Sequence, residues 1–302
     1  MENRKLTVRA TLSRIVVFGL ITLTLLTSWG VSAEDVITYT TRQGDDIKAV
    51  FIPALKTAPT PSPAIVMLHG CGGLYDSKGQ IRTRERAWID ELQVEGYALL
   101  LPASFASRGY ASLCKTKNRP VTPEGQRPFD AMGAVQYLAA KPEIDPKRIG
   151  LLGWSNGAMT GLHTVRIGAD AAPTAKEIDI KTAVLFYPGC IALKRSHPDY
   201  EARVPTLIQH GALDDWTLPD PCRELVASAG NRDGGAPMFI DLYDGAYHGF
   251  DHPDSKVRGI ITKNSAYASG QKEVHVGTHP EARKQAIART LAWFREHLGS
   301  AK

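Results

Sequence analysis

The stretch RIGLLGWSNGAMTG, residues 148–161, contains the strongest structural signal in this chain. Its apolar run ends at Trp154, and Ser155 follows with Gly153 two places before it and Gly157 two places after it. Such a serine fits a sharp turn between a buried strand and a helix, where the close approach of two backbones excludes larger side chains. A glycine-rich bend without chemistry is the alternative, because the pentad also occurs by chance. The remainder of the chain has to separate these two interpretations.

Apolar runs on both sides of this stretch predict a mostly parallel sheet. Runs such as 64–69 and 97–102 are continuously apolar, which is typical of strands covered on both faces. Alternation of such strands with helices predicts the α/β class, with a mostly parallel central sheet and helices on both faces, and ligands bind beyond the carboxyl ends of its strands. We expect strands at 47–52, 64–69, 97–102, 148–154, 182–188, 205–211 and 237–243, and helices within 83–96, at 127–140, after Ser155, after Pro221 and at 280–298.

The first 33 residues have the pattern of an export signal. Four basic side chains precede residue 15, an uncharged and mostly apolar run covers 15–29, and Val31 and Ala33 occupy the small-residue positions before a cleavage site. An uncleaved membrane anchor is the alternative, but the run is shorter than the ~20 residues that span a bilayer. We therefore expect cleavage after Ala33, a single domain over 34–302 with no stable membrane anchor, and a periplasmic or secreted protein.

Charge and cysteine content narrow the function classes. The chain carries 36 Lys and Arg against 31 Asp and Glu, and without the leader the net charge falls to about +2. No basic face is left that would indicate a nucleic-acid partner. The four cysteines form no Cys-x-x-Cys pair, which disfavours a zinc ribbon or a thioredoxin-like site. An even number of cysteines in an exported protein is compatible with two disulfides.

An acid and a histidine follow later strands in the order that serine chemistry requires. A serine hydroxyl is a weak nucleophile and needs a base and an orienting carboxylate, which on such sheets come in the order serine, acid, histidine. Asp214 and Asp215 follow the strand at 205–211, and His248 follows the strand at 237–243. Turn or cap residues and a surface histidine are the alternatives. We predict Ser155, Asp214 and His248 as catalytic, with Asp215 as the alternative acid.

The loop LHGCGG, residues 68–73, is the candidate for stabilising an oxyanion. Acyl transfer needs two backbone N–H donors, one from the residue after the nucleophile, here Asn156, and one from a loop after an earlier strand, for which we choose Cys71. A phosphate cradle would require a lysine that the loop lacks. Asp251 and His252 have no third ligand cluster, so we expect no metal and no cofactor, and we interpret His252 as a loop-surface residue.

These motifs together resemble the dienelactone hydrolase family of the α/β-hydrolase superfamily. The resemblance runs from about residue 60 to the last helix and includes LPASFASRG, RPFDAMGAVQYL, DPKRIGLLGWSNGA, LFYPGC, DDWTLPDPC and YHGF. The family's founding enzymes have a cysteine as nucleophile, a glutamate in the oxyanion loop and two arginines for a substrate carboxylate. Here Ser155 replaces the thiol, HGCGG has no acid, and His252 stands where the second arginine is expected. Arg108 is placed to be either an anion anchor or a loop arginine bonded to backbone carbonyls.

The positions of the four cysteines suggest that disulfides connect the loops around the predicted site. We propose the disulfides Cys71–Cys114 and Cys190–Cys222, because each would join neighbouring strand-end loops, with a reduced protein as the alternative. The function predicted is a serine hydrolase for a small or medium carboxylic ester or lactone. An acyltransferase or peptidase with the same residues, and a non-catalytic binding protein of the same fold, are the alternatives. The polar segment 251–279 is a candidate cover for the site.

Overall fold

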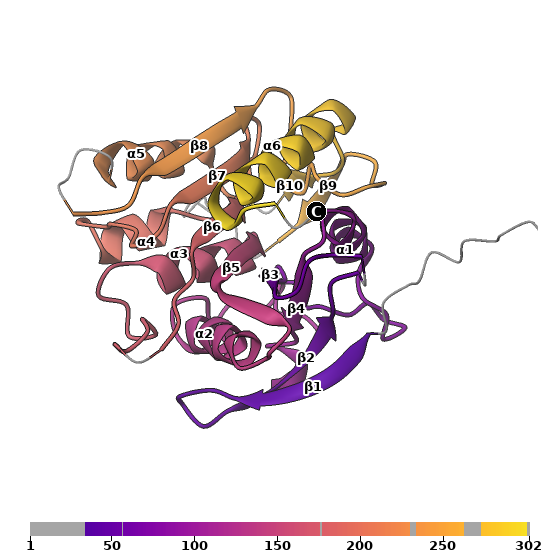
Figure 1. Cartoon of the computed structure of the whole chain (residues 1–302). Coiled ribbons are helices and arrows are strands. Elements are labelled where there is room, and N and C mark those ends of the chain that lie inside the picture. The colour runs from indigo at the N-terminus through magenta and orange to yellow at the C-terminus, as the bar shows by residue number, and fades with distance from the viewer. Residues whose placement is uncertain (1–33, 56, 176, 230–233, 263–272, 301–302) are drawn as a thin grey trace, which may run out of the picture. The chain divides into compact units, whose positions relative to one another are not determined.

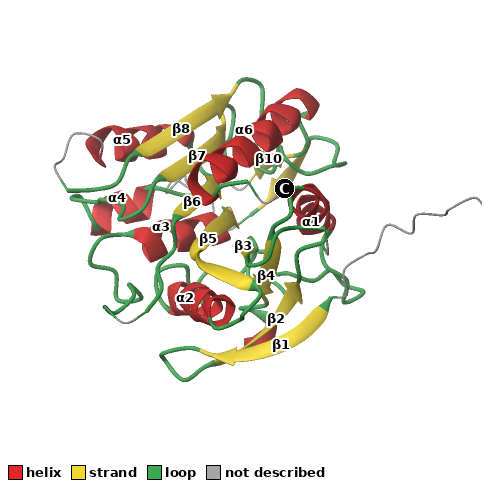
Figure 2. Ribbon diagram, in the orientation of Figure 1, coloured by secondary structure: helices red, strands yellow, loops and turns green. Residues whose placement is uncertain are grey.

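The predicted apolar runs form the core of one eight-stranded sheet (Figures 1 and 2). A computed structural model describes residues 34–300, except for 56, 176, 230–233 and 263–272. The leader and the cleavage position after Ala33 lie outside the described residues, and so does the middle of the 251–279 segment. The residues from 34 onward belong to one compact unit.

The elements alternate along the chain as expected for an α/β protein. The strands are β1 (Asp35–Thr40), β2 (Asp46–Ile52), β3 (Ser62–Leu68), β4 (Ala98–Pro102), β5 (Ile144–Trp154), β6 (Thr182–Phe186), β7 (Thr206–Gly211), β8 (Met238–Tyr243), β9 (Arg258–Ile261) and β10 (Glu273–Val276). The helices are α1 (Thr83–Val94), the short 3-10 helix η1 (Ala106–Arg108), α2 (Gln126–Ala139), α3 (Asn156–Val165), α4 (Ile191–Ser196), α5 (Pro219–Ala229) and α6 (Pro280–Leu298).

Strand order places the ends of the central strands at one edge. The order is β1-β2-β4-β3-β5-β6-β7-β8, with β1, β2 and β4 paired antiparallel and the pairs from β4 through β8 parallel. The parallel strands β3, β4, β6 and β7 are buried along their whole length, which explains their unbroken apolar sequences. The loops after β3, β5, β7 and β8 therefore meet at the carboxyl edge of the sheet.

Each face of the sheet is covered by its own helices. Figure 1 shows α2, α3 and α5 on one side and α1 and α6 on the other. On the first face Val135 and Leu162 pack in a core cluster with Leu151 of β5. On the second face Trp88 and Phe294 belong to a separate cluster. Burial of each such side chain contributes about 1.5–3 kcal/mol, so the two apolar layers hold the helices on the sheet.

Three parts of the fold were not predicted from sequence. β1 is an edge strand whose side chains are mostly exposed, and α4 has only six residues, so neither carries a strong apolar period. β9 and β10 form a small antiparallel sheet inside the 251–279 segment, next to the His248 loop through a bridge between His248 and Val276. Among the described helices, none is both long and apolar enough to cross a membrane.

Candidate active site

Ser155 stands at a strained turn between β5 and α3. Its backbone has φ 50° and ψ −112°, a conformation that few residues other than glycine adopt, and its N–H donates to the Phe186 carbonyl oxygen at 2.9 Å. A Cβ at Gly153 would lie 2.6 Å from the carbonyl oxygen of Gly157, and a Cβ at Gly157 would lie 2.0 Å from that of Leu68. Both glycines are therefore required by close backbone contact, as the sequence predicted for a turn between strand and helix.

Asp214 and His248 form a buried hydrogen-bonded pair beside this turn. The distance from His248 Nδ1 to Asp214 Oδ2 is 2.8 Å, and both side chains are buried. Asp214 Oδ1 also accepts the backbone N–H groups of Trp216 and Thr217, each at 2.9 Å. Burial alone would raise the pKa of Asp214, but the interactions with His248 and the other donors outweigh it and hold the pKa below its ordinary value. The carboxyl is therefore charged at neutral pH.

Asp215 has a different partner. Its Oδ2 lies 2.7 Å from Nδ1 of His275 on β10, and its Oδ1 accepts the His275 backbone N–H at 2.7 Å. The hydrogen bond to Asp215 raises the pKa of His275. Of the two adjacent acids, the structure thus places Asp214 on His248, and Asp215 joins the β9–β10 ribbon to the loop after β7.

Two cavities meet at Ser155. They have volumes of about 340 and 420 Å³ and share Cys71, Ser155 and Trp216 in their walls. The first is also lined by His248, and the second by Asn156. No described residue is hydrogen-bonded to the hydroxyl of Ser155, which leaves this group open to the cavities.

Aromatic rings fix the imidazole of His248. The Tyr187 ring lies 4.4 Å from the imidazole and the Trp216 ring 4.8 Å from it, measured between ring centres. The hydroxyl of Thr217 lies 3.1 Å from His248 Nδ1 and donates to the Tyr187 carbonyl oxygen at 3.0 Å. His210, buried on β7, lies with Nδ1 3.8 Å from Asp214 Oδ2. No local signal in the sequence marks Tyr187 or Thr217, because each contacts His248, which is distant in the chain.

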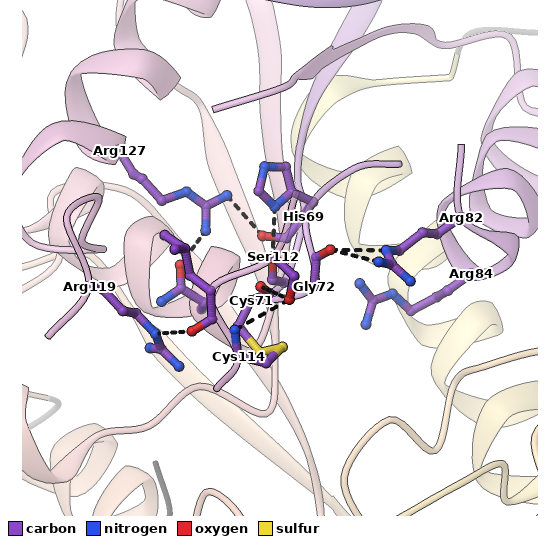
Figure 3. The surroundings of a disulfide bond; sticks show 12 residues. His69, Cys71, Gly72, Arg82, Arg84, Ser112, Cys114, Arg119 and Arg127 are labelled. Carbon is purple, nitrogen blue, oxygen red and sulfur yellow. Dashed lines mark hydrogen bonds between the residues drawn. A yellow bond between two sulfur atoms is a disulfide. The ribbon is translucent and has the colours of Figure 1, made fainter. Parts of the chain in front are cut away.

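The loop after β3, which holds the predicted oxyanion donor Cys71, lines both cavities. Cys71 lies in it and is bonded to Cys114, and the Cys71 carbonyl oxygen accepts the N–H of Leu113 at 2.9 Å (Figure 3). Within the described residues, the N–H groups of Cys71 and Asn156 donate to no other group, and both residues line a cavity that contains Ser155. Their role as oxyanion donors stays a prediction.

Both proposed disulfides are present. Cys71–Cys114 joins the loop after β3 to the segment that follows η1, and Cys190–Cys222 joins the loop after β6 to α5. The described residues contain no free cysteine. The pairing prediction is confirmed, and each bridge ties a cavity wall to a second element.

Arg108 is not an anion anchor in this structure. Its guanidinium donates to both carboxylate oxygens of Asp130 at 2.9 Å, to Asp45 at 2.6 Å and to the Ser104 carbonyl oxygen at 3.0 Å. It lines neither of the two cavities at Ser155. The loop-arginine interpretation is the better one, with the addition that two carboxylates, one from the turn before β2 and one from α2, neutralise the charge.

The residues after His248 also differ from expectation. His252 is half-buried and lines the smaller cavity, so the prediction of a loop-surface residue is wrong. Asp251 is fully buried and accepts hydrogen bonds from the indole N–H groups of Trp88 and Trp154 and from the hydroxyl of Tyr187. In the part of the chain that the structure describes, no three His, Cys, Asp or Glu residues are grouped to hold a metal ion.

Comparison with solved structures gives the fold. The dienelactone hydrolase-like promiscuous phosphotriesterase P91 from metagenomic libraries has a TM-score of 0.62 at 19% identity, over 89% of this chain and 99% of P91. The Est2 esterase of Thermogutta terrifontis, with bound propionate, has a TM-score of 0.58 at 16% identity, over 90% of this chain and 96% of that chain. At these identities the likeness extends to the fold, which is that of the α/β-hydrolases.

Comparison with sequences gives the family. The protein YtaP of Bacillus subtilis (strain 168) is 28% identical over 131 residues, which make up 39% of this chain and 44% of YtaP, so the match covers less than half of that relative. The model of the dienelactone hydrolase family matches residues 50–298, which run from within β2 to the end of α6. The chain therefore belongs to the dienelactone hydrolase family.

Proposed function

We propose that this protein is a serine hydrolase that cleaves a small or medium carboxylic ester or lactone through an acyl-enzyme on Ser155. One observation carries the proposal: Ser155, on a strained turn, lines the same cavity as His248, whose other ring nitrogen is bonded to the buried carboxylate of Asp214. Nucleophile, base and orienting acid are brought together from the ends of β5, β8 and β7.

In the first half of the reaction, His248 acts as the base. Its Nε2 takes the proton of the Ser155 hydroxyl while the oxygen attacks the ester carbonyl carbon, and Asp214 holds the ring and stabilises the imidazolium. The N–H groups of Cys71 and Asn156 stabilise the negative oxygen of the tetrahedral intermediate. The imidazolium then gives its proton to the leaving alkoxide as the carbon–oxygen bond breaks.

In the second half, water replaces the alcohol. His248 removes a proton from water, the hydroxide attacks the acyl carbon, and collapse of the second tetrahedral intermediate releases the carboxylic acid and restores the Ser155 hydroxyl. The cavities of about 340 and 420 Å³ on the two sides of Ser155 suit a small acyl and a small alcohol portion. The names of P91 and Est2, a phosphotriesterase and an esterase, are in line with ester chemistry on this fold.

We also propose that the protein is exported, with residues 1–33 as its signal and the rest as one domain. Two disulfides support an oxidising compartment, because such bonds are rare in reducing ones.

A fluorophosphonate probe and short p-nitrophenyl esters test the proposed chemistry. The purified protein should be labelled and should hydrolyse the esters, whereas Ser155→Ala should lose both properties. Ser228→Ala, on α5 and outside both cavities, is the matched control and should behave like the native protein. Native protein that neither reacts with the probe nor exceeds the Ser155→Ala rate on any ester would refute the proposal.

A further inference from the structure

Arg127 is a buried cation to which the described part of the chain gives no ion-pair partner. It lies on α2 with no exposed surface, and among the described residues no carboxylate lies within 4 Å of its guanidinium. The nearby acid Asp130 is engaged with Arg108. Burial lowers the pKa of Arg127 to about 9, so the side chain still carries its charge at pH 7.

Burying such a charge is costly. A desolvated cation without a counter-ion destabilises a fold, and apolar residues of similar volume are as good or better for stability. By contrast Arg203, which is only partly buried, is neutralised by Asp179. A residue that is unfavourable for stability is a candidate for a role in function, and its contacts show which role.

The guanidinium of Arg127 joins the two segments that carry the predicted oxyanion donors. Nη1 donates to the side-chain Oδ1 of Asn156 at 2.5 Å, and Nη2 donates to the carbonyl oxygen of His69 at 2.8 Å (Figure 3). Asn156 is the first residue of α3, and His69 stands two residues before Cys71 in the loop after β3. One rigid, planar side chain thus fixes the end of β3 relative to the start of α3.

Packing leaves the guanidinium little freedom. Its central carbon lies 5.0 Å from the ring centre of Phe105, and the same ring packs edge-on against His69 at 4.7 Å. Burial and then the charge of Arg127 lower the pKa of His69, so this histidine is neutral beside the cation. Among the three packed side chains Arg127, Phe105 and His69, Arg127 is therefore the one that carries a charge.

We propose that Arg127 is a positioning residue of the oxyanion site, which sets the separation of the Cys71 and Asn156 N–H groups and places a positive charge behind them. Arg127 itself lines neither cavity and has no hydrogen bond to Ser155 among the described residues, so it acts through Asn156 and the His69 carbonyl. The inference rests on the proposed function. Preorganised donors act mainly on the charge that develops in the transition state, so the effect belongs in kcat.

Kinetics of two Arg127 variants give the first test. Loss of one oxyanion donor lowers kcat by about 10²–10³, so loss of a residue that only positions donors should lower it by about 10–10². We expect that reduction for Arg127→Met on p-nitrophenyl esters, with KM changed less than about threefold, and partial recovery in Arg127→Lys, which keeps the charge. Arg203→Met removes a partly buried arginine outside both cavities and should leave kcat within about threefold.

A trifluoromethyl ketone separates positioning from general destabilisation. Such a ketone adds to Ser155 to form a tetrahedral oxyanion, so its inhibition constant should rise by the factor by which kcat/KM falls. If Arg127→Met does not fold, Asn156→Ala removes the acceptor of Arg127 but keeps the backbone N–H, and should show the same two effects. In the double variant of Arg127→Lys and Asn156→Ala the two losses should not add.

The outcomes separate this inference from the proposed function. A native protein without esterase activity overturns the proposed function and this inference with it. An active native protein whose Arg127→Lys and Asn156→Ala variants keep native kcat and native inhibition by the ketone overturns this inference alone. A fall in kcat with unchanged inhibition by the ketone also overturns it, since the oxyanion would then be stabilised equally well.

Discussion

The buried carboxylate of Asp251 offers the sharpest test of how the loops of the site are held. Its Oδ2 accepts the indole N–H groups of Trp88 on α1 and Trp154 on β5, each at 2.8 Å, and its Oδ1 accepts the Tyr187 hydroxyl at 2.5 Å. Trp154 directly precedes Ser155, and the Tyr187 ring packs on the imidazole of the site. One acid therefore ties the histidine loop to α1 and to the ends of β5 and β6.

The expected loss in the free energy of unfolding follows from the number of hydrogen-bond donors that Asp251 satisfies. Asp251→Ala would leave three buried donors without an acceptor, at about 1–3 kcal/mol each, which predicts a loss of at least about 3 kcal/mol in the free energy of unfolding. Asp251→Asn keeps the shape and one acceptor oxygen but replaces charge-assisted hydrogen bonds by neutral ones, and it relieves the cost of burying a charge. We expect a loss of about 2 kcal/mol for this variant.

Urea unfolding followed by tryptophan fluorescence measures both losses by linear extrapolation. The control is Asp241→Asn on β8, whose ion pair with Arg289 is about one-third exposed and should contribute only about 0–1 kcal/mol. Asp251→Asn should also lower kcat, because Trp154 and Tyr187 no longer share a charged acceptor. Losses for Asp251→Ala no greater than that of the control would refute the reasoning.

Three further predictions concern the site and its surroundings. Asp214→Asn should lower kcat on p-nitrophenyl esters by about 10²–10⁴, because it removes the carboxylate charge that orients the imidazole of His248 and stabilises the imidazolium. Asp215→Asn should stay within about tenfold, and the reverse order would exchange their roles. Gly157→Ala should abolish hydrolysis or folded yield, measured by circular dichroism and the ester assay, since its Cβ would lie 2.0 Å from the Leu68 carbonyl oxygen. Because its bond to Asp215 raises the pKa of His275, this pair stabilises the fold fully below the ordinary histidine pKa of about 6.5. The stabilisation is lost as pH rises through the pKa that His275 has in the folded protein. The Tm difference between the native protein and Asp215→Asn should therefore shrink from pH 5.5 to 9. A constant difference would contradict this linkage.

Much of this fold was predictable from local patterns. Unbroken apolar runs predict strands that are covered on both faces, and β3, β4, β6 and β7 are indeed buried at every position. The glycines at 153 and 157 indicate that two backbone segments approach closely at the turn that holds Ser155. Because parallel strands end at one edge, the order of serine, acid and histidine along the chain already placed these loops together.

Local patterns carried no information where a partner is distant in sequence. Asp214 and Asp215 are chemically identical neighbours, and only the packing of the β9–β10 ribbon shows that the second belongs to His275. Arg108 follows a strand as a ligand-binding arginine would, yet acids 22 and 63 residues away neutralise it.

The sequence by itself predicted the parallel strands of the sheet, the turn that presents Ser155 and the loops that surround it, and it suggested the cysteine pairs that the structure confirms. The tertiary structure alone decided which acid meets His248, that Arg108 is neutralised, and that Asp251 and Arg127 are buried behind the site. The physical reason is that periodicity and turn chemistry reflect the surroundings of each residue, whereas the partner of a polar side chain depends on which distant segments the packed layers bring within hydrogen-bond distance.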